Sequence, residues 1–214
     1  ERDVATAMDF ALEQVKSNLA EFTYQFKKAY SEEGMYHPTE NVNWTTGFWT
    51  GQVWLAYEWA KRIGDEAGAE ALKAAGEIQI ENFLERIEKK IEVDHHDMGF
   101  LYSPSCVAGF KLVGSEKGKE AAVKAADQLI SRFHPVGEFI QAWGPMDQPE
   151  NYRFIIDCLL NLPLLYWASE ETGDEKYREI AGKHLRTAAA NVIREDYSTW
   201  HTFFMNMETG APDH

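Results

Sequence analysis

Apolar side chains recur every three or four residues along most of this chain, which is the spacing that gathers them on one face of an α-helix. Residues 3–30 follow this spacing throughout, so the pattern predicts one long amphipathic helix there. No segment alternates convincingly between apolar and polar residues, as a half-buried strand would. We therefore expect an all-α protein without a major sheet.

A short turn motif occurs three times and divides the chain into helical hairpins. It consists of a glycine, then aspartate or serine, then glutamate. The turn glycines are Gly64, Gly114 and Gly173, and the residues after them are Asp65, Ser115 and Asp174. Glycine readily adopts the left-handed conformation that ends a helix, and aspartate or serine accepts hydrogen bonds from the first amides of the next helix. The motif therefore predicts three tight helix–turn–helix units.

The two helices of each unit differ in polarity. Before the turn, residues 48–57 and 159–167 are apolar nearly all round, which predicts buried helices. After a turn, residues 120–130 are amphipathic. Buried inner helices followed by amphipathic outer ones describe a toroid of αα-hairpins, with a helical solenoid as the competing architecture. With 214 residues, the chain has the length of one large domain, so we treat residues 1–214 as a single domain.

The composition excludes several classes of partner. The net charge of −14 makes neither nucleic acid nor an anionic membrane surface an expected partner. No apolar run approaches the ~20 residues that a membrane span needs. Cys106 and Cys158 lie in apolar segments and are predicted to be buried free thiols. Seven tryptophans in an acidic protein favour sugar binding, because the CH faces of sugars stack on aromatic rings.

Asp157 is the leading candidate for an acid–base residue. It lies between the apolar segments 154–156 and 159–160, where a charged carboxylate is costly and its pKa is expected to rise. A general acid needs such a raised pKa. The structural alternatives are that Asp157 caps a helix or pairs with Arg153.

Asp97 is the second candidate carboxylate. It follows two histidines and precedes the segment 98–100, and its alternative role is that of a solvated helix N-cap. On adjacent inner helices, whose axes lie about 8–10 Å apart, Asp97 and Asp157 could both reach one small ligand. Paired carboxylates of this kind carry out glycoside chemistry.

A metal site is the alternative for the run Asp94, His95, His96 and Asp97. It is disfavoured because consecutive side chains point in different directions, and no His or Cys pair with ligand spacing accompanies them. Sequence signatures of serine hydrolases, nucleotide-binding loops and dinucleotide-binding folds are absent as well. We therefore expect no metal and no other cofactor.

Five segments, in this order along the chain, resemble the unsaturated glucuronyl hydrolases: residues 43–51, 95–103, 141–144, 155–162 and 197–204. Together they span essentially the whole chain. The resemblance implies an (α/α)6 toroid, which agrees with the hairpin pattern. It also implies an enzyme that hydrates the C4=C5 double bond of the unsaturated uronate that polysaccharide lyases leave at a non-reducing end.

The resemblance also assigns roles to single residues. It implies that Asp157 gives a proton to C4 and helps water to add at C5, after which the hemiketal collapses and releases the neighbouring sugar. Asp97 corresponds to the second essential carboxylate. The remaining matches are Trp44 and Trp143, which correspond to sugar-stacking positions, and His96 and His201, which correspond to polar contacts with the substrate.

The chain differs from this family in length. A six-hairpin toroid needs about twice the three hairpins found here, so we expect a catalytic domain that is C-terminally incomplete and whose partner is its missing half. Apolar flanks, residues 159–167 among them, would then face water. The expected substrate is an unsaturated oligosaccharide of the glycosaminoglycan type. Alternatives are an unsaturated rhamnogalacturonyl hydrolase and a non-catalytic glycan-binding fragment. We expect a cytoplasmic location, with the periplasm as the alternative because the N-terminus looks trimmed.

Overall fold

The computed structural model describes residues 2–213, with the side chains from Asp3 onward. These residues form two compact units, each treated by itself. Unit 1 lies within residues 1–91 and 101–121, and unit 2 within residues 92–100 and 122–214. In the part of the chain that the structure describes, no helix combines the length and apolarity that a membrane crossing requires.

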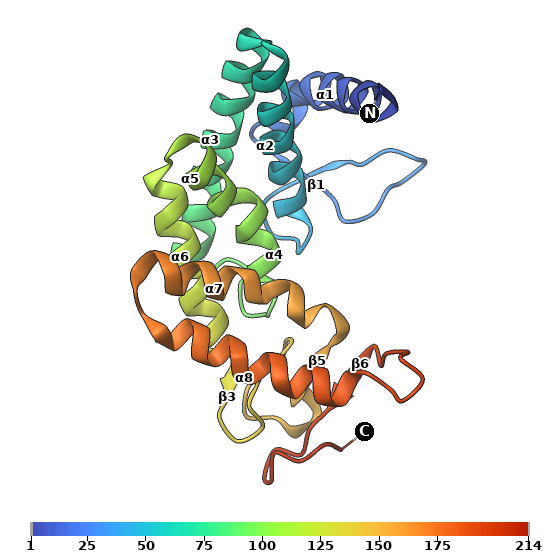
Figure 1. Cartoon of the computed structure of the whole chain (residues 1–214), viewed down its shortest axis with the longest axis vertical. Coiled ribbons are helices and arrows are strands. Elements are labelled where there is room, and N and C mark those ends of the chain that lie inside the picture. Colours follow the sequence, from blue (N-terminus) through green and yellow to red (C-terminus); the bar gives the residue numbers. More distant parts are fainter. Residues whose placement is uncertain (1, 214) are drawn as a thin grey trace. The chain divides into compact units, whose positions relative to one another are not determined.

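Unit 1 is built on a helical hairpin of α2 (Thr46–Ile63) and α3 (Glu66–Glu88), which run side by side (Figure 1). Helix α1 (Arg2–Phe22) packs against this pair, and a two-stranded ribbon of β1 (Phe26–Lys27) and β2 (Pro38–Thr39) follows α1. Three short helical segments complete the unit in chain order: α4 (Met98–Tyr102), which starts in unit 2, the π-helix η1 (Ser103–Val107), and α5 (Ala108–Val113).

The prediction of one long helix over residues 3–30 is wrong at the C-terminal end, because α1 ends at Phe22. Two side chains account for this end. The Trp49 indole N–H and the Gln79 amide both donate to the Phe22 carbonyl oxygen, at 2.8 and 2.6 Å. In a continuing α-helix that carbonyl would accept from residue 26. Phe26 instead lies in β1, where its side chain is buried.

The three predicted turns are confirmed. Each turn glycine ends a helix in the left-handed conformation, with φ of 79° at Gly64, 71° at Gly114 and 74° at Gly173. The next residue caps the following helix. Asp65, Ser115 and Asp174 each accept a hydrogen bond from a backbone amide in that helix's first turn, at 2.9, 3.2 and 3.0 Å respectively.

Unit 2 contains the hairpin of α7 (Leu162–Thr172) and α8 (Glu175–Val192), preceded by α6 (Glu116–Ile130), whose start belongs to unit 1. Two short antiparallel ribbons hold its loops. One pairs β3 (Phe133–His134) with β4 (Phe139–Ile140), and the other pairs β5 (Arg153–Ile155) with β6 (Thr202–Phe204). Two 3-10 helices complete it: η2 (Pro149–Asn151) and η3 (Ile156–Asn161). The expectation of no major sheet is confirmed, since the described strands have two or three residues each.

The inner helix expected over residues 159–167 begins later than its apolar pattern suggests. Residues up to Asn161 belong to the 3-10 helix η3, and the α-helix starts at Leu162 with Pro163 in its first turn. Proline has no N–H to donate to the carbonyl of residue 159, so it suits a helix start but not a helix interior. Asp157 therefore lies on a tight, irregular turn.

The expected exposure of this apolar segment is also wrong. Of its large side chains, Leu160 is exposed, whereas the following four are buried: Leu162, Leu164, Leu165 and Trp167. The two cysteines are free and buried, as predicted, and burial raises the pKa of both thiols to about 12.

Candidate active site

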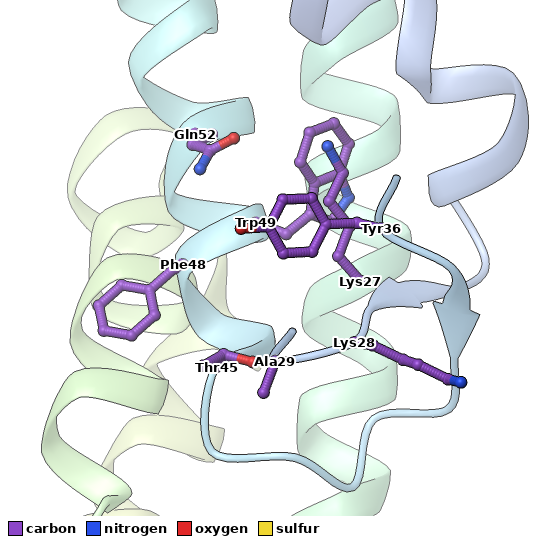
Figure 2. Close-up of a pocket in the computed structure, with 8 residues that line it drawn as sticks. All are labelled: Lys27, Lys28, Ala29, Tyr36, Thr45, Phe48, Trp49 and Gln52. Atoms are coloured by element: carbon purple, nitrogen blue, oxygen red, sulfur yellow. The ribbon is translucent and has the colours of Figure 1, made fainter. Parts of the chain in front are cut away.

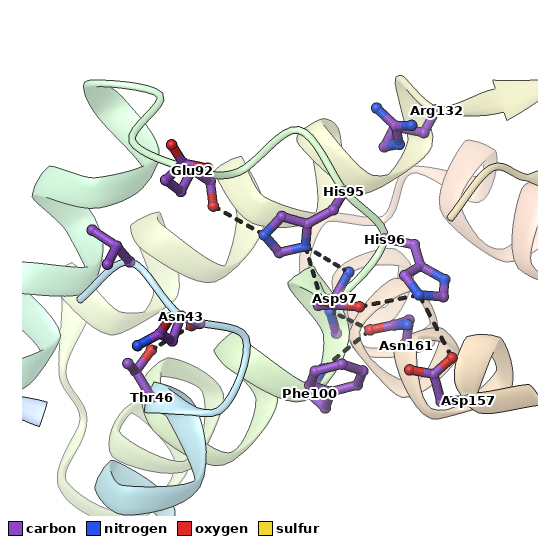
Figure 3. Close-up of polar contacts among 12 residues, drawn as sticks. Asn43, Thr46, Glu92, His95, His96, Asp97, Phe100, Arg132, Asp157 and Asn161 are labelled. Atoms are coloured by element: carbon purple, nitrogen blue, oxygen red, sulfur yellow. Dashed lines mark hydrogen bonds and ion pairs between the residues drawn. The ribbon is translucent and has the colours of Figure 1, made fainter. Parts of the chain in front are cut away.

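Asp97 and Asp157 approach each other in unit 2 with the His96 ring between them (Figure 3). The Nε2 atom of His96 lies 3.1 Å from an Asp97 carboxylate oxygen and 3.6 Å from an Asp157 oxygen. His96 is almost completely buried, and the two carboxylates are partly accessible. Two acids, 60 positions apart in the chain numbering, thus approach the same nitrogen of one imidazole.

Backbone contacts fix the loop that carries His96 and Asp97. The His96 amide donates to the Ala142 carbonyl at 2.8 Å, and His95 forms a β-bridge with Trp143. These contacts join the His96 loop to the segment that carries Trp143. The ring of Trp143 then meets the ring of His96 edge to face, with centroids 6.4 Å apart.

Asn161 ties the two carboxylate-bearing segments together. Its side-chain oxygen accepts from the amides of Gly99 and Phe100 at 2.9 and 3.2 Å, which caps the first turn of α4 directly after Asp97 (Figure 3). Asn161 also ends η3, the 3-10 helix that carries Asp157. One buried amide side chain therefore sets where Asp97 lies relative to Asp157.

The surroundings of Asp157 favour its protonated form. Burial raises the pKa of Asp157 and the nearby Asp97 carboxylate raises it further, while His96 and His201 act in the opposite direction. The ion pair with Arg153 considered from the sequence is not made. The Arg153 guanidinium lies over the Trp143 ring instead, 4.6 Å from the ring centroid.

The surroundings of Asp97 favour its charged form. Burial acts to raise the pKa of Asp97, but hydrogen bonding and charge interactions with His95 and His96 outweigh it and lower the pKa to about 2. The His95 Nδ1 lies 3.2 Å from the other Asp97 oxygen and also accepts from the Asp97 amide at 3.1 Å. The pKa values of the two carboxylates are therefore shifted in opposite directions, the pattern that separates a general acid from a charged partner.

The remaining candidates in unit 2 flank this pair. Trp143 is 40% exposed, so one part of its indole can meet a ligand. His201 lies on the other side, where its carbonyl accepts from the amide of Ile156, the residue before Asp157, at 2.9 Å. Trp44 belongs to unit 1, where its side chain is exposed. The structure thus brings together every predicted site residue that lies within unit 2.

Two residues that support the site were not singled out from the sequence, Arg132 and Asn161, and His95 was considered there only as part of a metal site. Arg132 is buried, pairs with Asp94 and donates to the Gly144 carbonyl at 2.9 Å, which braces the loop carrying Trp143. A buried arginine in an acidic chain has no local pattern that reveals it. The spacing of Asn161 could have indicated its role, because Asn161 follows Asp157 by about one helical turn.

A cation could approach this cluster. His96, Asp97 and Asp157 each offer one ligand atom, and these atoms lie within 4.8 Å of one another. The set differs from the consecutive run considered from the sequence, because Asp94 pairs with Arg132 instead. An imidazole with two carboxylates can bind zinc or similar ions.

A helical chain with two neighbouring aspartates whose pKa values are shifted in opposite directions, beside a partly exposed tryptophan, resembles the glycoside hydrolases. The sequence profile of Glycosyl Hydrolase Family 88 matches residues 18–210, and this chain belongs to that family. The unsaturated chondroitin disaccharide hydrolase of Streptococcus pyogenes serotype M1 is 46% identical over 212 residues, which are 99% of this chain and 51% of that protein.

Solved structures extend the comparison. The unsaturated glucuronyl hydrolase of Streptococcus agalactiae matches with a TM-score of 0.92 and 44% identity, over 98% of this chain and 51% of that one. Its counterpart from Bacillus sp. GL1 matches with a TM-score of 0.87 and 40% identity, over 95% and 52%. The predicted resemblance and fold class are confirmed, since these enzymes are α/α toroids. The chain spans about half the length of the relatives it matches.

Proposed function

We propose that this chain carries the acid–base half of an enzyme that releases unsaturated glucuronate from lyase-generated glycosaminoglycan disaccharides. The observation that carries the proposal is the Asp97–His96–Asp157 cluster, in which the pKa of Asp157 is raised and that of Asp97 is lowered. Relatives named for unsaturated chondroitin disaccharide and unsaturated glucuronyl hydrolysis support the substrate class.

In the proposed reaction Asp157 transfers its proton to C4 of the C4=C5 double bond. Positive charge then develops at C5 and the ring oxygen, and the negative charge of Asp97 stabilises it. Water adds at C5 and returns a proton to the Asp157 carboxylate. The product is a hemiketal that opens to a keto-uronate and releases the neighbouring sugar.

The other site residues would bind and orient the substrate. The exposed part of Trp143 offers a stacking face for a sugar ring, with Trp44 proposed as a second such face. His96, whose Nε2 lies near both carboxylates, orients them, and His201 is available for a hydrogen bond to the substrate. We further propose a single catalytic domain that needs the remaining hairpins of the toroid as a partner segment, and a cytoplasmic location with the periplasm as the alternative.

The experiment that tests the function follows the ultraviolet absorbance of the C4=C5 double bond in unsaturated chondroitin disaccharides. It uses the chain together with the remaining toroid segment. We expect Asp157→Asn to lower kcat by about 100-fold or more, because a general acid is lost. Asp147→Asn, which changes an exposed carboxylate of the same unit, should leave kcat unchanged.

Three outcomes would contradict the proposal. Near-normal turnover by Asp157→Asn removes Asp157 from the mechanism. Binding of the disaccharide without any loss of the double bond favours the glycan-binding alternative. Faster turnover of unsaturated rhamnogalacturonan disaccharides than of chondroitin disaccharides would favour the rhamnogalacturonyl alternative.

A further inference from the structure

A pocket of about 260 Å³ lies in unit 1, and none of its lining residues has a role in the proposed reaction (Figure 2). Its lining combines two lysines with a threonine hydroxyl and several aromatic rings: Lys27, Lys28, Thr45, Tyr36, Phe48 and Trp49. These residues come from β1, from the loop between β1 and β2, and from the start of α2. The volume is close to that of a small-ligand site.

Lys27 carries a charge that no carboxylate neutralises directly. Its ammonium lies 4.2 Å from the centroid of the Trp49 ring and 5.0 Å from that of Phe22, and within the described residues it has no ion pair. Burial lowers the pKa of Lys27, although the charge of Glu21 opposes this. An ammonium held between rings and removed from part of its water gains from an anion that reaches it.

The neighbouring lysine provides a contrast. Lys28 pairs with Glu32 at 3.2 Å, and in Figure 2 its side chain points away from the group formed by Lys27, Tyr36 and Trp49. Two consecutive lysines thus differ in the one property that matters for an anion. Lys27 is unpaired and faces the pocket rings, whereas Lys28 is already neutralised.

Thr45 supplies a second polar contact. It stands at the N-cap position of α2 but makes no side-chain cap hydrogen bond, and its hydroxyl oxygen is buried with no hydrogen-bond partner among the described residues. A buried hydroxyl without a partner is unfavourable. The N-terminal end of a long helix adds partial positive charge at the same place.

The aromatic walls favour a sugar over a bare ion. Phe48 is 44% exposed on the first turn of α2, and Tyr36 is exposed on the facing ribbon. Open ring faces beside a cation and a hydroxyl can hold the CH face of a pyranose and its charged substituent at once. A bare inorganic anion would use the polar groups alone.

We propose that this pocket binds an anionic saccharide, with its sulfate or carboxylate on Lys27, its pyranose ring against Phe48 and one of its hydroxyl groups on Thr45. The proposal goes beyond the proposed catalysis, because no residue of the pocket takes part in it. It gives a strongly acidic protein a local place where a negatively charged sugar is attracted.

The test is a titration of the isotope-labelled chain, joined to the remaining toroid segment, with N-acetylgalactosamine 6-sulfate, read by NMR at the Trp49 indole N–H. Glucuronate, neutral N-acetylgalactosamine and inorganic sulfate are titrated in parallel. We expect saturable shifts with the sulfated sugar or with glucuronate, which identifies the charged group, and much weaker binding of the neutral sugar. Lys27→Met should weaken binding roughly tenfold or more, the range for a lost charged hydrogen bond.

Two further variants keep the test decisive. Lys28→Met is the matched control and should change binding by about twofold at most, because Glu32 already neutralises Lys28. Lys27→Arg keeps the positive charge and should retain binding. It therefore tests the role of the charge even if Lys27→Met unfolds the ribbon. The proposal is overturned if no anionic sugar shifts the Trp49 signal, if Lys27→Met binds like the parent, or if inorganic sulfate binds as tightly as the sugar.

Discussion

Gly99 packs directly against the backbone of Asn161, and a Cβ atom at Gly99 would overlap the Asn161 Cα. The same pair is joined by the hydrogen bond from the Gly99 amide to the Asn161 side chain. Since Gly99 follows Asp97 by two residues and Asn161 follows Asp157 by four, this contact sets the separation of the two carboxylates.

Gly99→Ala should therefore destabilise the protein and lower its activity. The backbone must move to admit a methyl group, which costs about 1–3 kcal/mol in an already packed site. We expect a lower melting temperature and a lower kcat, measured by thermal unfolding and disaccharide turnover.

Gly182→Ala is the matched control. Gly182 lies inside α8, where the nearest atom to an added Cβ is the flexible end of Arg186 at 3.4 Å. Alanine favours the helix over glycine by about 1 kcal/mol. The control should thus be neutral or stabilising, and an equal loss in both variants would contradict a special role for the Gly99–Asn161 contact.

Trp143→Ala should weaken substrate binding more than it weakens folding. The Trp143 side chain is 40% exposed and stacks on Arg153, so its removal leaves no closed cavity. We expect KM to rise roughly tenfold, as for an aromatic contact at the centre of a binding site. Trp167→Ala, which removes a buried tryptophan from α7, should instead cost about 3–5 kcal/mol of stability. A collapse of the Trp143→Ala melting temperature with unchanged KM would make Trp143 a core residue.

The pKa values of the two site carboxylates should be shifted in opposite directions from the ordinary value of aspartate. The raised pKa of Asp157 keeps its proton above the usual range, so kcat/KM should fall as pH rises through that pKa. The pKa of Asp97 is lowered to about 2, so its carboxylate stays charged throughout that range. Carbon-13 NMR of the carboxyl groups checks both directions, and Asp97 titrating after Asp157 would contradict the assignment.

The free energy of unfolding should depend on pH as these two pKa shifts require. Asp97 has a lower pKa folded than unfolded, so it contributes on the order of 2 kcal/mol above about pH 4, and this contribution is lost as pH falls towards 2. Asp157 acts oppositely, because its raised pKa disfavours the folded state once pH exceeds that pKa. Denaturant unfolding of Asp97→Asn should therefore converge with the parent at low pH.

Chelation should leave turnover intact. His96, Asp97 and Asp157 could hold a cation, but a cation would stabilise the charged Asp157 carboxylate and remove the proton that the proposed reaction uses. We expect activity to survive dialysis against a chelator and added zinc to inhibit. Loss of activity on chelation, followed by recovery with zinc or calcium, would show that the cluster is a functional metal site.

Local features of the fold were predictable from the sequence, and long-range ones were not. The turns at Gly64, Gly114 and Gly173 follow from residues that cap neighbouring helix ends. The end of α1 at Phe22 depends on Trp49 and Gln79, which lie 27 and 57 positions further along the chain. Periodicity describes one helix at a time and carries no sign of such a contact.

In the candidate site, too, local features were predictable from the sequence and long-range contacts were not. The apolar neighbours of Asp157 predicted its raised pKa, because burial is the largest cause. The lowered pKa of Asp97 needed the positions of His95 and His96, and the role of Asn161 needed a hydrogen bond across 62 positions. The functional roles of Asp97, Asp157, Trp44, Trp143, His96 and His201 stay predictions until the variants are measured.

The isolated chain of residues 1–214 should self-associate and be inactive. A groove of about 350 Å³ between α1 and α2 leaves large apolar side chains open, with Phe10 68% and Leu55 59% exposed. Burying each would contribute about 1.5–3 kcal/mol, a large fraction of a domain's stability. We expect sedimentation to show concentration-dependent association, which the double variant Phe10→Glu, Leu55→Glu relieves.

Tyr24→Glu controls for added negative charge, because Tyr24 is exposed away from that groove and should not affect association. Since the groove variant removes exposed apolar surface rather than core, its melting temperature should not fall. Joining the chain to the remaining toroid hairpins should also relieve association and restore turnover. A monodisperse and fully active monomer of 214 residues would contradict the half-toroid interpretation.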